Sequence, residues 1–185
     1  PAAARTRSAS AARMRLLLII GPPGVGKSSA AKHLSGLLDE AQVAHAYVDR
    51  DDFGRDGLLC EDPLIDLNEL LQARVAAGAQ RLIVAWRVES GDELARVRAV
   101  LDWADVTVCR LRAEPRELLA RIASAEPSFQ SLHLQTMAMQ IAPRLERQVR
   151  EDILLATDCT PPPAVAMRAF RQWAMQGESP ASDST

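Results

Sequence analysis

A glycine-rich segment that follows the first apolar run of the chain restricts the fold more than any other feature. Residues 21–28 are GPPGVGKS, which fits the Walker A pattern G-x-x-x-x-G-K-[ST] at every fixed position. The preceding run RLLLII (15–20) predicts a short buried strand, and the following SAAKHL (29–34) predicts the start of a helix. A strand, a tight glycine turn and a helix, in this order, are what a phosphate-binding loop requires.

The residue types of this loop have specific tasks in such a site. Glycines let backbone N–H groups converge on phosphate oxygens, and the N-terminus of the helix adds a favourable dipole. Lys27 is expected to reach the β- and γ-phosphates, and the Ser28 hydroxyl to hold Mg²⁺. The chain has two lysines against twenty arginines, so finding one of them at the motif position argues against coincidence. We expect the triphosphate to lie along Gly21, Pro22, Pro23, Gly24, Val25, Gly26, Lys27, Ser28 and Ser29.

Five short apolar strands alternate with helices along the chain. The strands are predicted at 15–20, 45–49, 81–86, 106–111 and 153–157. The helices are predicted from 29 to about 38 and at 62–78, 90–103, 115–123, 135–150 and 164–175. This alternation predicts a three-layer α/β fold, in which a five-stranded parallel sheet is covered by helices on both faces. One such domain, residues 14–176, accounts for most of the 185 residues.

The two ends differ from this domain in composition. Residues 1–13 are mostly Ala, Ser and Arg, and we expect a disordered extension, with an organelle transit peptide as the alternative. The polar tail, residues 177–185, is also expected to be disordered.

Net charge and cysteine content limit the classes of partner and the cellular location that the sequence suggests. The net charge of −2 does not favour nucleic acid, and no apolar run approaches the roughly 20 residues of a membrane span. The three cysteines are widely spaced, which predicts neither a disulfide framework nor a zinc site, and a cytoplasmic location is expected. The oligomeric state is not predicted by any of these features.

Acidic residues follow the second strand, at the edge of the sheet where ligands bind in folds of this class. Asp49 is the last residue of its strand and is therefore the most rigidly aimed. Asp51 shares the same side if the chain stays extended. A carboxylate here would accept a proton from an acceptor hydroxyl or help to hold Mg²⁺. The alternative is a solvated acidic turn, which is preferred for Asp52, disfavoured for Asp49 and left open for Asp51.

Two further short patterns are set aside. Residues 52–54 (DFG) match a protein-kinase triplet, but the chain has no H-R-D segment. Residues 51–54 (DDFG) match the D-x-x-G of GTPases, but no N-K-x-D segment follows. We therefore expect neither a protein kinase nor a GTPase.

The span 16–55 resembles small P-loop kinases such as adenylylsulfate kinase, shikimate and gluconate kinases and chloramphenicol phosphotransferase. The resemblance is carried by residues 21–28 and by YVDRDDFGRD (47–56), which is similar to the D-x-D-x-x-R stretch of adenylylsulfate kinase. It implies an ATP-dependent phosphotransferase that uses Mg²⁺ and a small-molecule acceptor. It also implies that Asp49, with Asp51 second, lies at the acceptor. Arg121 resembles the lid arginine that stacks on adenine, and residues 157–161 resemble the loop over the other face of the base.

The chain departs from these kinases at two places. Ala125 stands where a second lid arginine is usual; arginines at 144, 147 and 150 are the possible substitutes, or else a solvated face pairing with Glu146 and Glu151. The third strand ends in VAW (84–86) without the Walker B aspartate, which leaves the metal to Ser28, Asp49 and water.

Two expectations concern the rest of the site. Trp86 and Arg87 are candidates to line the acceptor pocket, with core packing as the alternative for Trp86. Residues 126–133 are expected to form a loop that closes as a lid.

The alternative to a phosphotransferase is an ATP-binding or ATPase regulatory protein without kinase activity.

Overall fold

The computed structural model describes residues 13–52, 62–125 and 129–175. Within them the order of elements is β1 (Met14–Ile20), α1 (Lys27–Glu40), β2 (His45–Asp49), a 3₁₀ turn η1 (Arg50–Asp52), α2 (Pro63–Ala76), β3 (Arg81–Ala85), α3 (Gly91–Val100), β4 (Ala104–Arg112), α4 (Pro115–Ala125), α5 (Phe129–Gln148), β5 (Ile153–Ala156) and α6 (Pro162–Met175). The acceptor-side segment 53–61 and the first part of the expected lid, 126–128, lie outside the described residues, as do both chain ends.

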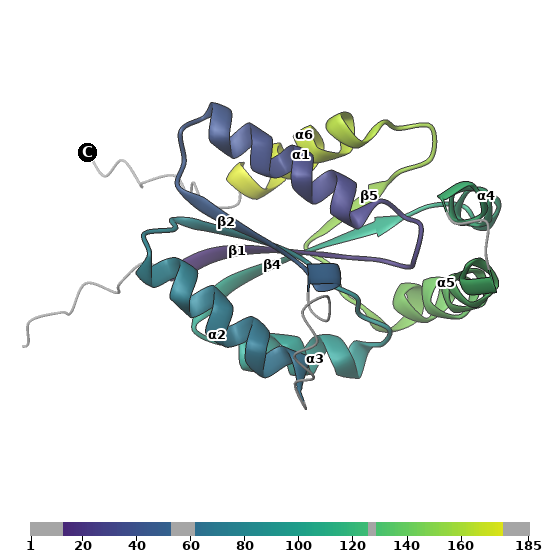
Figure 1. Ribbon diagram of the computed structural model, residues 1–185, viewed down its shortest axis with the longest axis horizontal. Coiled ribbons are helices and arrows are strands. Elements are labelled where there is room, and N and C mark those ends of the chain that lie inside the picture. Colours follow the sequence, from purple (N-terminus) through teal and green to yellow (C-terminus); the bar gives the residue numbers. More distant parts are fainter. Residues whose placement is uncertain (1–12, 53–61, 126–128, 176–185) are drawn as a thin grey trace, which may run out of the picture.

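The strands form one parallel sheet in the order β2-β3-β1-β4-β5. Helices α1 and α6 cover one face and α2 and α3 the other, while α4 and α5 lie together at one end of the molecule (Figure 1). This is the predicted three-layer α/β fold. Because all strands are parallel, their carboxyl ends meet at one edge.

The apolar residues of β1 explain why it lies in the middle of the sheet. All five residues from Leu16 to Ile20 are buried, as expected for a strand covered on both faces. Leu16, Leu18 and Ile20 belong to the core under α2 and α3, whereas Leu17 and Ile19 belong to the core under α1 and α6. The alternation follows the two-residue period of a strand.

Local signals set the starts of α2 and α3 as predicted. The Asp62 carboxylate accepts a hydrogen bond from the Leu64 N–H at 3.0 Å, and Pro63 occupies the first helical position. The Ser90 hydroxyl accepts from the Glu93 N–H at 3.2 Å, while the Glu93 carboxylate accepts from the Glu89 N–H at 2.7 Å. These two contacts form a capping box whose reciprocal hydrogen bond reaches one residue further back than usual.

The expected loop at 126–133 is wrong for its second part, because α5 begins at Phe129. A stripe at helical spacing runs from Ser131 through Leu134, Ala138 and Ile141, and Ser131 is only 6% exposed. The polar character of Ser131 hid this turn from the sequence pattern. Its neighbours in the stripe are apolar and supply the burial that makes the turn helical.

Candidate active site

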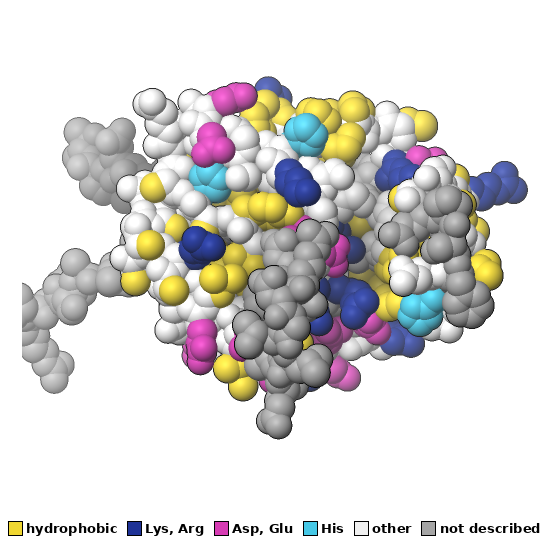
Figure 2. Space-filling model, viewed as in Figure 1, with side chains coloured by type: hydrophobic (Ala, Val, Ile, Leu, Met, Phe, Trp, Pro, Cys, Tyr) yellow, Lys and Arg dark blue, Asp and Glu magenta, His cyan; other side chains and the backbone are white. Residues whose placement is uncertain are grey.

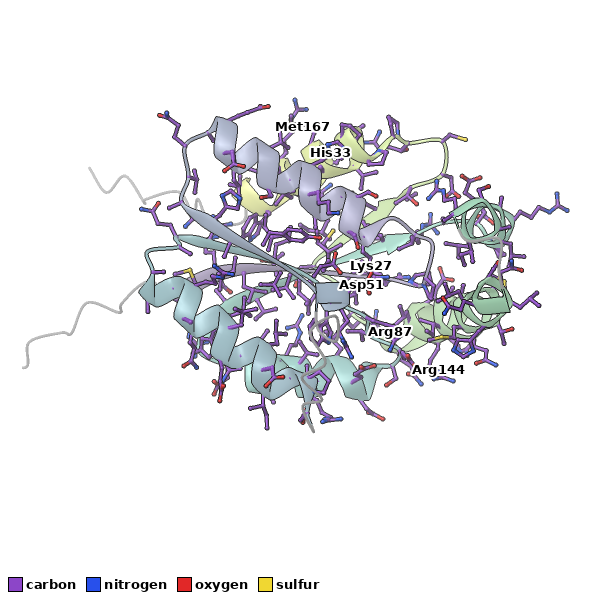
Figure 3. All side chains as sticks on the ribbon, in the orientation of Figure 1. Lys27, His33, Asp51, Arg87, Arg144 and Met167 are labelled. Carbon is purple, nitrogen blue, oxygen red and sulfur yellow. The ribbon has the colours of Figure 1, made fainter. Side chains whose placement is uncertain are left out.

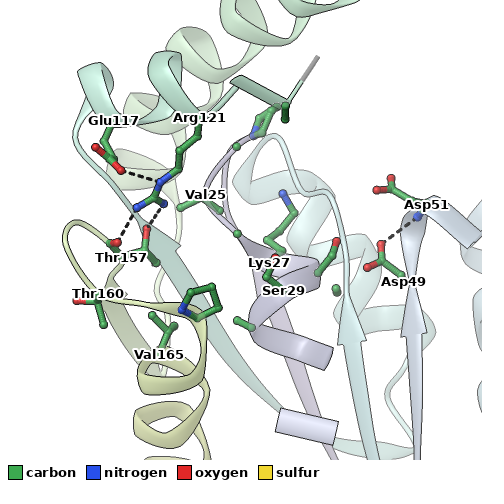
Figure 4. Close-up of a pocket in the computed structure, with 18 of the residues that line it drawn as sticks. Val25, Lys27, Ser29, Asp49, Asp51, Glu117, Arg121, Thr157, Thr160 and Val165 are labelled. Atoms are coloured by element: carbon green, nitrogen blue, oxygen red, sulfur yellow. Dashed lines mark hydrogen bonds and ion pairs between the residues drawn. The ribbon is translucent and has the colours of Figure 1, made fainter. Parts of the chain in front are cut away.

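A cavity of about 790 Å³ lies at the carboxyl edge of the sheet. Arg121 and Thr157 lie at one end of it, Asp49 and Asp51 at the other, and Lys27 between them (Figure 4). The lining comes from the phosphate-loop segment, the ends of β2 and β3, α4, α5 and the β5–α6 connection with the start of α6. Its residues are Pro23, Gly24, Val25, Gly26, Lys27, Ser28, Ser29, Ala30, Asp49, Arg50, Asp51, Ala85, Arg87, Glu117, Arg121, Ala125, Leu134, Thr157, Cys159, Thr160, Pro161, Pro162 and Val165.

Glycine is required at two points of the loop for different reasons. At Gly24 (φ 76°) an added Cβ would lie 2.7 Å from Cγ1 of Ile122, so a side chain would separate the loop from α4. Gly26 (φ 94°) has open space around it but caps α1 in the left-handed region. The first turn of α1 has no side-chain cap and no acidic residue. Its N–H groups therefore suit an anion.

The Lys27 ammonium donates hydrogen bonds to the carbonyl oxygens of Gly21 and Pro22, at 3.0 and 3.1 Å. The pKa of Lys27 is lowered to about 8, mainly because its ammonium is buried, and the charge of Arg87 contributes in the same direction. Asp51 and Asp49 act in the opposite direction, but they do not overcome the loss of solvation. The cavity thus holds a cation that is short of solvent.

Asp49 is 7% exposed at the end of β2. Its Oδ2 accepts a hydrogen bond from the Tyr47 hydroxyl at 2.5 Å, and its Oδ1 accepts from the Asp51 N–H at 3.1 Å (Figure 4). Both contacts use the carboxylate as an acceptor and hold it in a fixed direction. Asp51, by contrast, has an exposed side chain.

The opposite end of the cavity is built around Arg121. Its guanidinium donates to the Glu117 carboxylate at 2.8 Å, to the Thr157 hydroxyl at 3.0 Å and to the Thr157 carbonyl at 2.8 Å. These contacts join α4 to the chain after β5. They hold the guanidinium plane at the cavity wall, next to Thr160 and Pro161.

The structure brings most of the predicted site residues together in this one cavity. Residues 23–29, Asp49, Asp51 and Arg121 line it, whereas Pro22 lines a separate cavity of about 260 Å³ behind the loop. Gly21 is not in the lining, and it contributes its carbonyl to Lys27.

The structure places the remaining candidate residues differently. Arg87 lines the cavity, whereas Trp86 is 2% exposed and belongs to the core. The arginines at 144, 147 and 150 are exposed and do not line the cavity. Glu151 pairs with the buried Arg110 at 3.0 Å, and the charges of Arg110 and Arg150 both act to lower the pKa of Glu151.

Sequence reasoning missed two charged lining residues. Glu117 precedes Arg121 by four positions, the helical spacing of an ion pair, so that signal was available. Arg50 had no such signal. Its guanidinium lies 5.3 Å from the centre of the Trp86 ring, a contact that only the pairing of β2 with β3 creates.

The donor atoms in the cavity fit Mg²⁺. The Ser28 hydroxyl and the Asp49 carboxylate are oxygen donors, and Mg²⁺ is usually held by few protein ligands together with water and phosphate oxygens. The Asp49 carboxylate accepts hydrogen bonds from Tyr47 and from the Asp51 N–H, so both contacts use it as an acceptor. No group of three or more His, Cys, Asp or Glu side chains suited to a metal occurs in the part of the chain that the structure describes. Such a group is not needed for Mg²⁺ in a nucleotide site.

Comparisons with known proteins give matches at the level of structure. The chain matches APS kinase CysC of Mycobacterium tuberculosis, solved with AMPPNP and APS, with a TM-score of 0.62 at 18% identity over 90% of this chain and 99% of that one. It matches a gluconokinase from Sinorhizobium meliloti 1021 with a TM-score of 0.59 at 15% identity, over 89% and 94% of the two chains. A sugar kinase from Janibacter sp. gives a TM-score of 0.60 at 22% identity, over 87% and 95%.

The chain has the fold of the small P-loop kinases. No protein-family model and no curated protein sequence matches it. Among the helices of the described residues, none combines the length and the apolar character that crossing a membrane demands.

Proposed function

We propose that the chain is an ATP-dependent phosphotransferase that moves the γ-phosphate of ATP to a hydroxyl of a small molecule. The observation that carries the proposal is the order of groups along one cavity: Arg121, then the loop with Lys27, then Asp49. This order matches the order of the reacting groups, which are the adenine base of ATP, its phosphates and the acceptor molecule. The fold is shared with small-molecule kinases, one of which was solved with AMPPNP and APS.

In the proposed reaction the acceptor hydroxyl oxygen attacks the γ-phosphorus of ATP. The bond between the γ-phosphorus and the β,γ-bridging oxygen breaks, and ADP leaves with that electron pair. The hydroxyl proton passes to the Asp49 carboxylate, whose direction is fixed by Tyr47 and by the Asp51 N–H. Asp49 can accept it because its two hydrogen bonds are donated to it rather than by it.

The loop and Lys27 would bind and orient the phosphates. Lys27 would exchange the carbonyls of Gly21 and Pro22 for phosphate oxygens, which carry more negative charge. The uncapped first turn of α1 adds backbone N–H groups to the same charge. Mg²⁺, held by Ser28 and Asp49 with water, would neutralise charge on the phosphates when bound. Preorganised donors of this kind stabilise the transition state most.

The test is the pair Asp49→Asn and Asp102→Asn. Radiolabelled ATP is incubated with a panel of hydroxyl-bearing metabolites, and ATP affinity is measured in parallel. We expect Asp49→Asn to keep ATP affinity, measured without Mg²⁺, within about threefold and to lower transfer at least a hundredfold, because the amide cannot take the proton. Asp102 is exposed in the turn after α3 and serves as the control. Transfer at the parent rate in Asp49→Asn would remove this carboxylate from the mechanism.

A second candidate is an ATP-binding or ATPase regulatory protein without kinase activity. The observation in its favour is the end of β3, where the cavity is lined by Ala85 and Arg87 rather than by a carboxylate. The same assay separates the two. Release of ADP with no labelled acceptor across the panel, unchanged by Asp49→Asn, would favour this candidate.

A further inference from the structure

Two arginines line the cavity on the side of Lys27 away from Arg121. They are Arg50, which follows β2, and Arg87, which follows β3. Lys27, Asp51 and Arg87 lie near the middle of the molecule, between the two helical layers (Figure 3). Basic and acidic side chains lie next to one another near the middle of this face (Figure 2).

The sheet register explains why Arg87 lies close to the phosphate end. Ala85 of β3 is the partner of Asp49 on one side and of Ile19 on the other. Arg87, two residues further on, therefore leaves the sheet between the start of the phosphate loop and the acidic segment after β2. Its charge is the smallest of the four influences on the pKa of Lys27, and it acts to lower that pKa.

The arginines of this edge differ in how firmly they are held. Arg121 makes three hydrogen bonds of 3.0 Å or less, and Arg110 makes two to Glu151 with its side chain only 7% exposed. Arg50 is stacked on the Trp86 ring. Among the described residues Arg87 has one ion pair, to Glu89 at 3.5 Å, and its side chain is 46% exposed.

A pair this long and exposed is weak, because water screens it. Arg87 can therefore exchange Glu89 for a ligand at little cost. Two cations, Lys27 and Arg87, also face the same cavity, and the repulsion between them falls when an anion binds near both. The γ-phosphate is one such anion, and we assign it to Lys27. A second anion would then be the partner of Arg87.

We infer that the acceptor carries an oxyanion, a carboxylate, phosphate or sulfate group, in addition to its hydroxyl, and that Arg87 binds it. The inference rests on the proposed function. The planar guanidinium matches the paired oxygens of such a group. The exposed carboxylate of Asp51 repels an anion from the β2 side, so the acceptor would place its hydroxyl at Asp49 and its anion at Arg87.

The test uses inorganic sulfate as the probe on the protein saturated with Mg²⁺ and AMP-PNP. The nucleotide fills the phosphate positions, so sulfate reports on a second oxyanion site. Calorimetric titration at low ionic strength should give one sulfate per chain in the parent. Arg87→Gln should weaken it about tenfold, the effect of losing one charged hydrogen-bonding partner, and Arg87→Lys should fall between the two.

Arg98→Gln is the matched control. Arg98 also makes one ion pair, at 3.4 Å to Asp152, with its side chain 44% exposed, but it does not line the cavity. Arg98→Gln should bind sulfate with an affinity within twofold of that of the parent. Absence of a second sulfate site, or equal affinity in the parent and Arg87→Gln, overturns the inference alone. Weaker AMP-PNP binding in Arg87→Gln with no sulfate site would assign Arg87 to the γ-phosphate and also overturn it. Failure of AMP-PNP to bind at all would overturn the proposed function, and the inference with it.

Discussion

Lys27 illustrates how a residue that serves a ligand can weaken the protein that carries it. The structure buries its ammonium and gives it two backbone carbonyls as partners. Neutral carbonyls replace water poorly around a charge, and the lowered pKa of about 8 reflects that loss. A bound phosphate would therefore stabilise the charged form of Lys27 further.

Replacing Lys27 with methionine should therefore stabilise the protein without nucleotide. We expect the Tm at pH 7 to rise by about 2 to 6 °C, corresponding to about 1 to 2 kcal/mol in a domain of this size. The gain should shrink between pH 8 and pH 10.5, because over that range the folded parent has lost the proton while the unfolded chain still binds it. Stability of the parent thus rises with pH there, and the variant has no such group. Thermal denaturation at pH 7 and pH 10 measures both effects.

Lys32→Met is the control for this experiment, since Lys32 is the other lysine of the chain and is exposed on α1. It should change the Tm by less than about 1 °C. A Lys27→Met protein that melts below the parent at pH 7, or whose advantage is the same at both pH values, would contradict the account of a desolvated charge.

At the scale of elements, α1 contains a glycine that its position does not require. Gly36 is helical, and an added Cβ would meet no atom within 4 Å. Gly36→Ala should therefore stabilise the protein by about 0.5 to 1 kcal/mol, the cost of glycine inside a helix. Gly78 also has open space but has φ +102°, so Gly78→Ala should destabilise by about 1 kcal/mol. Urea denaturation measures both changes. Equal signs for the two variants would show that space rather than backbone conformation decides.

A second feature at the scale of elements is the contact between α4 and the chain after β5. Arg121 joins the two through Thr157, and it lines the end of the cavity proposed for the base. Arg121→Ala should weaken ATP binding about tenfold, through loss of stacking and of a fixed wall. It should affect inorganic triphosphate less, because that ligand has no base. Arg116 is exposed on the same helix, and Arg116→Ala should bind ATP like the parent. Equal weakening of ATP and triphosphate by Arg121→Ala would place its effect on the phosphates.

The sequence predicted elements well where short-range chemistry decides them. The starts of α2 and α3 follow from Asp62, Pro63 and Ser90, whose side chains act within one turn. The extra turns of α5 could not be predicted in this way, because Ser131 is buried although it is polar, and the sequence pattern does not mark a buried polar residue. The Arg50–Trp86 contact could not be predicted either, because it depends on the pairing of β2 with β3.

For the whole molecule, the order of strands explains how one cavity gathers residues from most of the chain. The central strand β1 leads into the phosphate loop, β3 and β2 lie on one side of it, and β4 and β5 lie on the other. Residues after β2 and β3 therefore form the proposed acceptor end, and residues after β4 and β5 the proposed base end. The pattern of alternating strands and helices was enough to predict this edge as the site. Under the proposed function, the choice among acceptors would depend on side chains such as Arg87 that no motif marks.

A ligand that spans such a cavity should stabilise the molecule as a unit. At a concentration of Mg²⁺ and AMP-PNP one hundred times the Kd, binding to the folded chain alone contributes about 2.7 kcal/mol. In a chain of 185 residues that corresponds to a rise in Tm of about 5 to 10 °C, measurable by differential scanning fluorimetry. Adenosine at the same concentration should give a much smaller rise, because it makes no contact with the loop. Lys27→Ala should lose most of the AMP-PNP effect. A parent with no shift, or a variant with the full shift, would show that the loop does not bind the triphosphate.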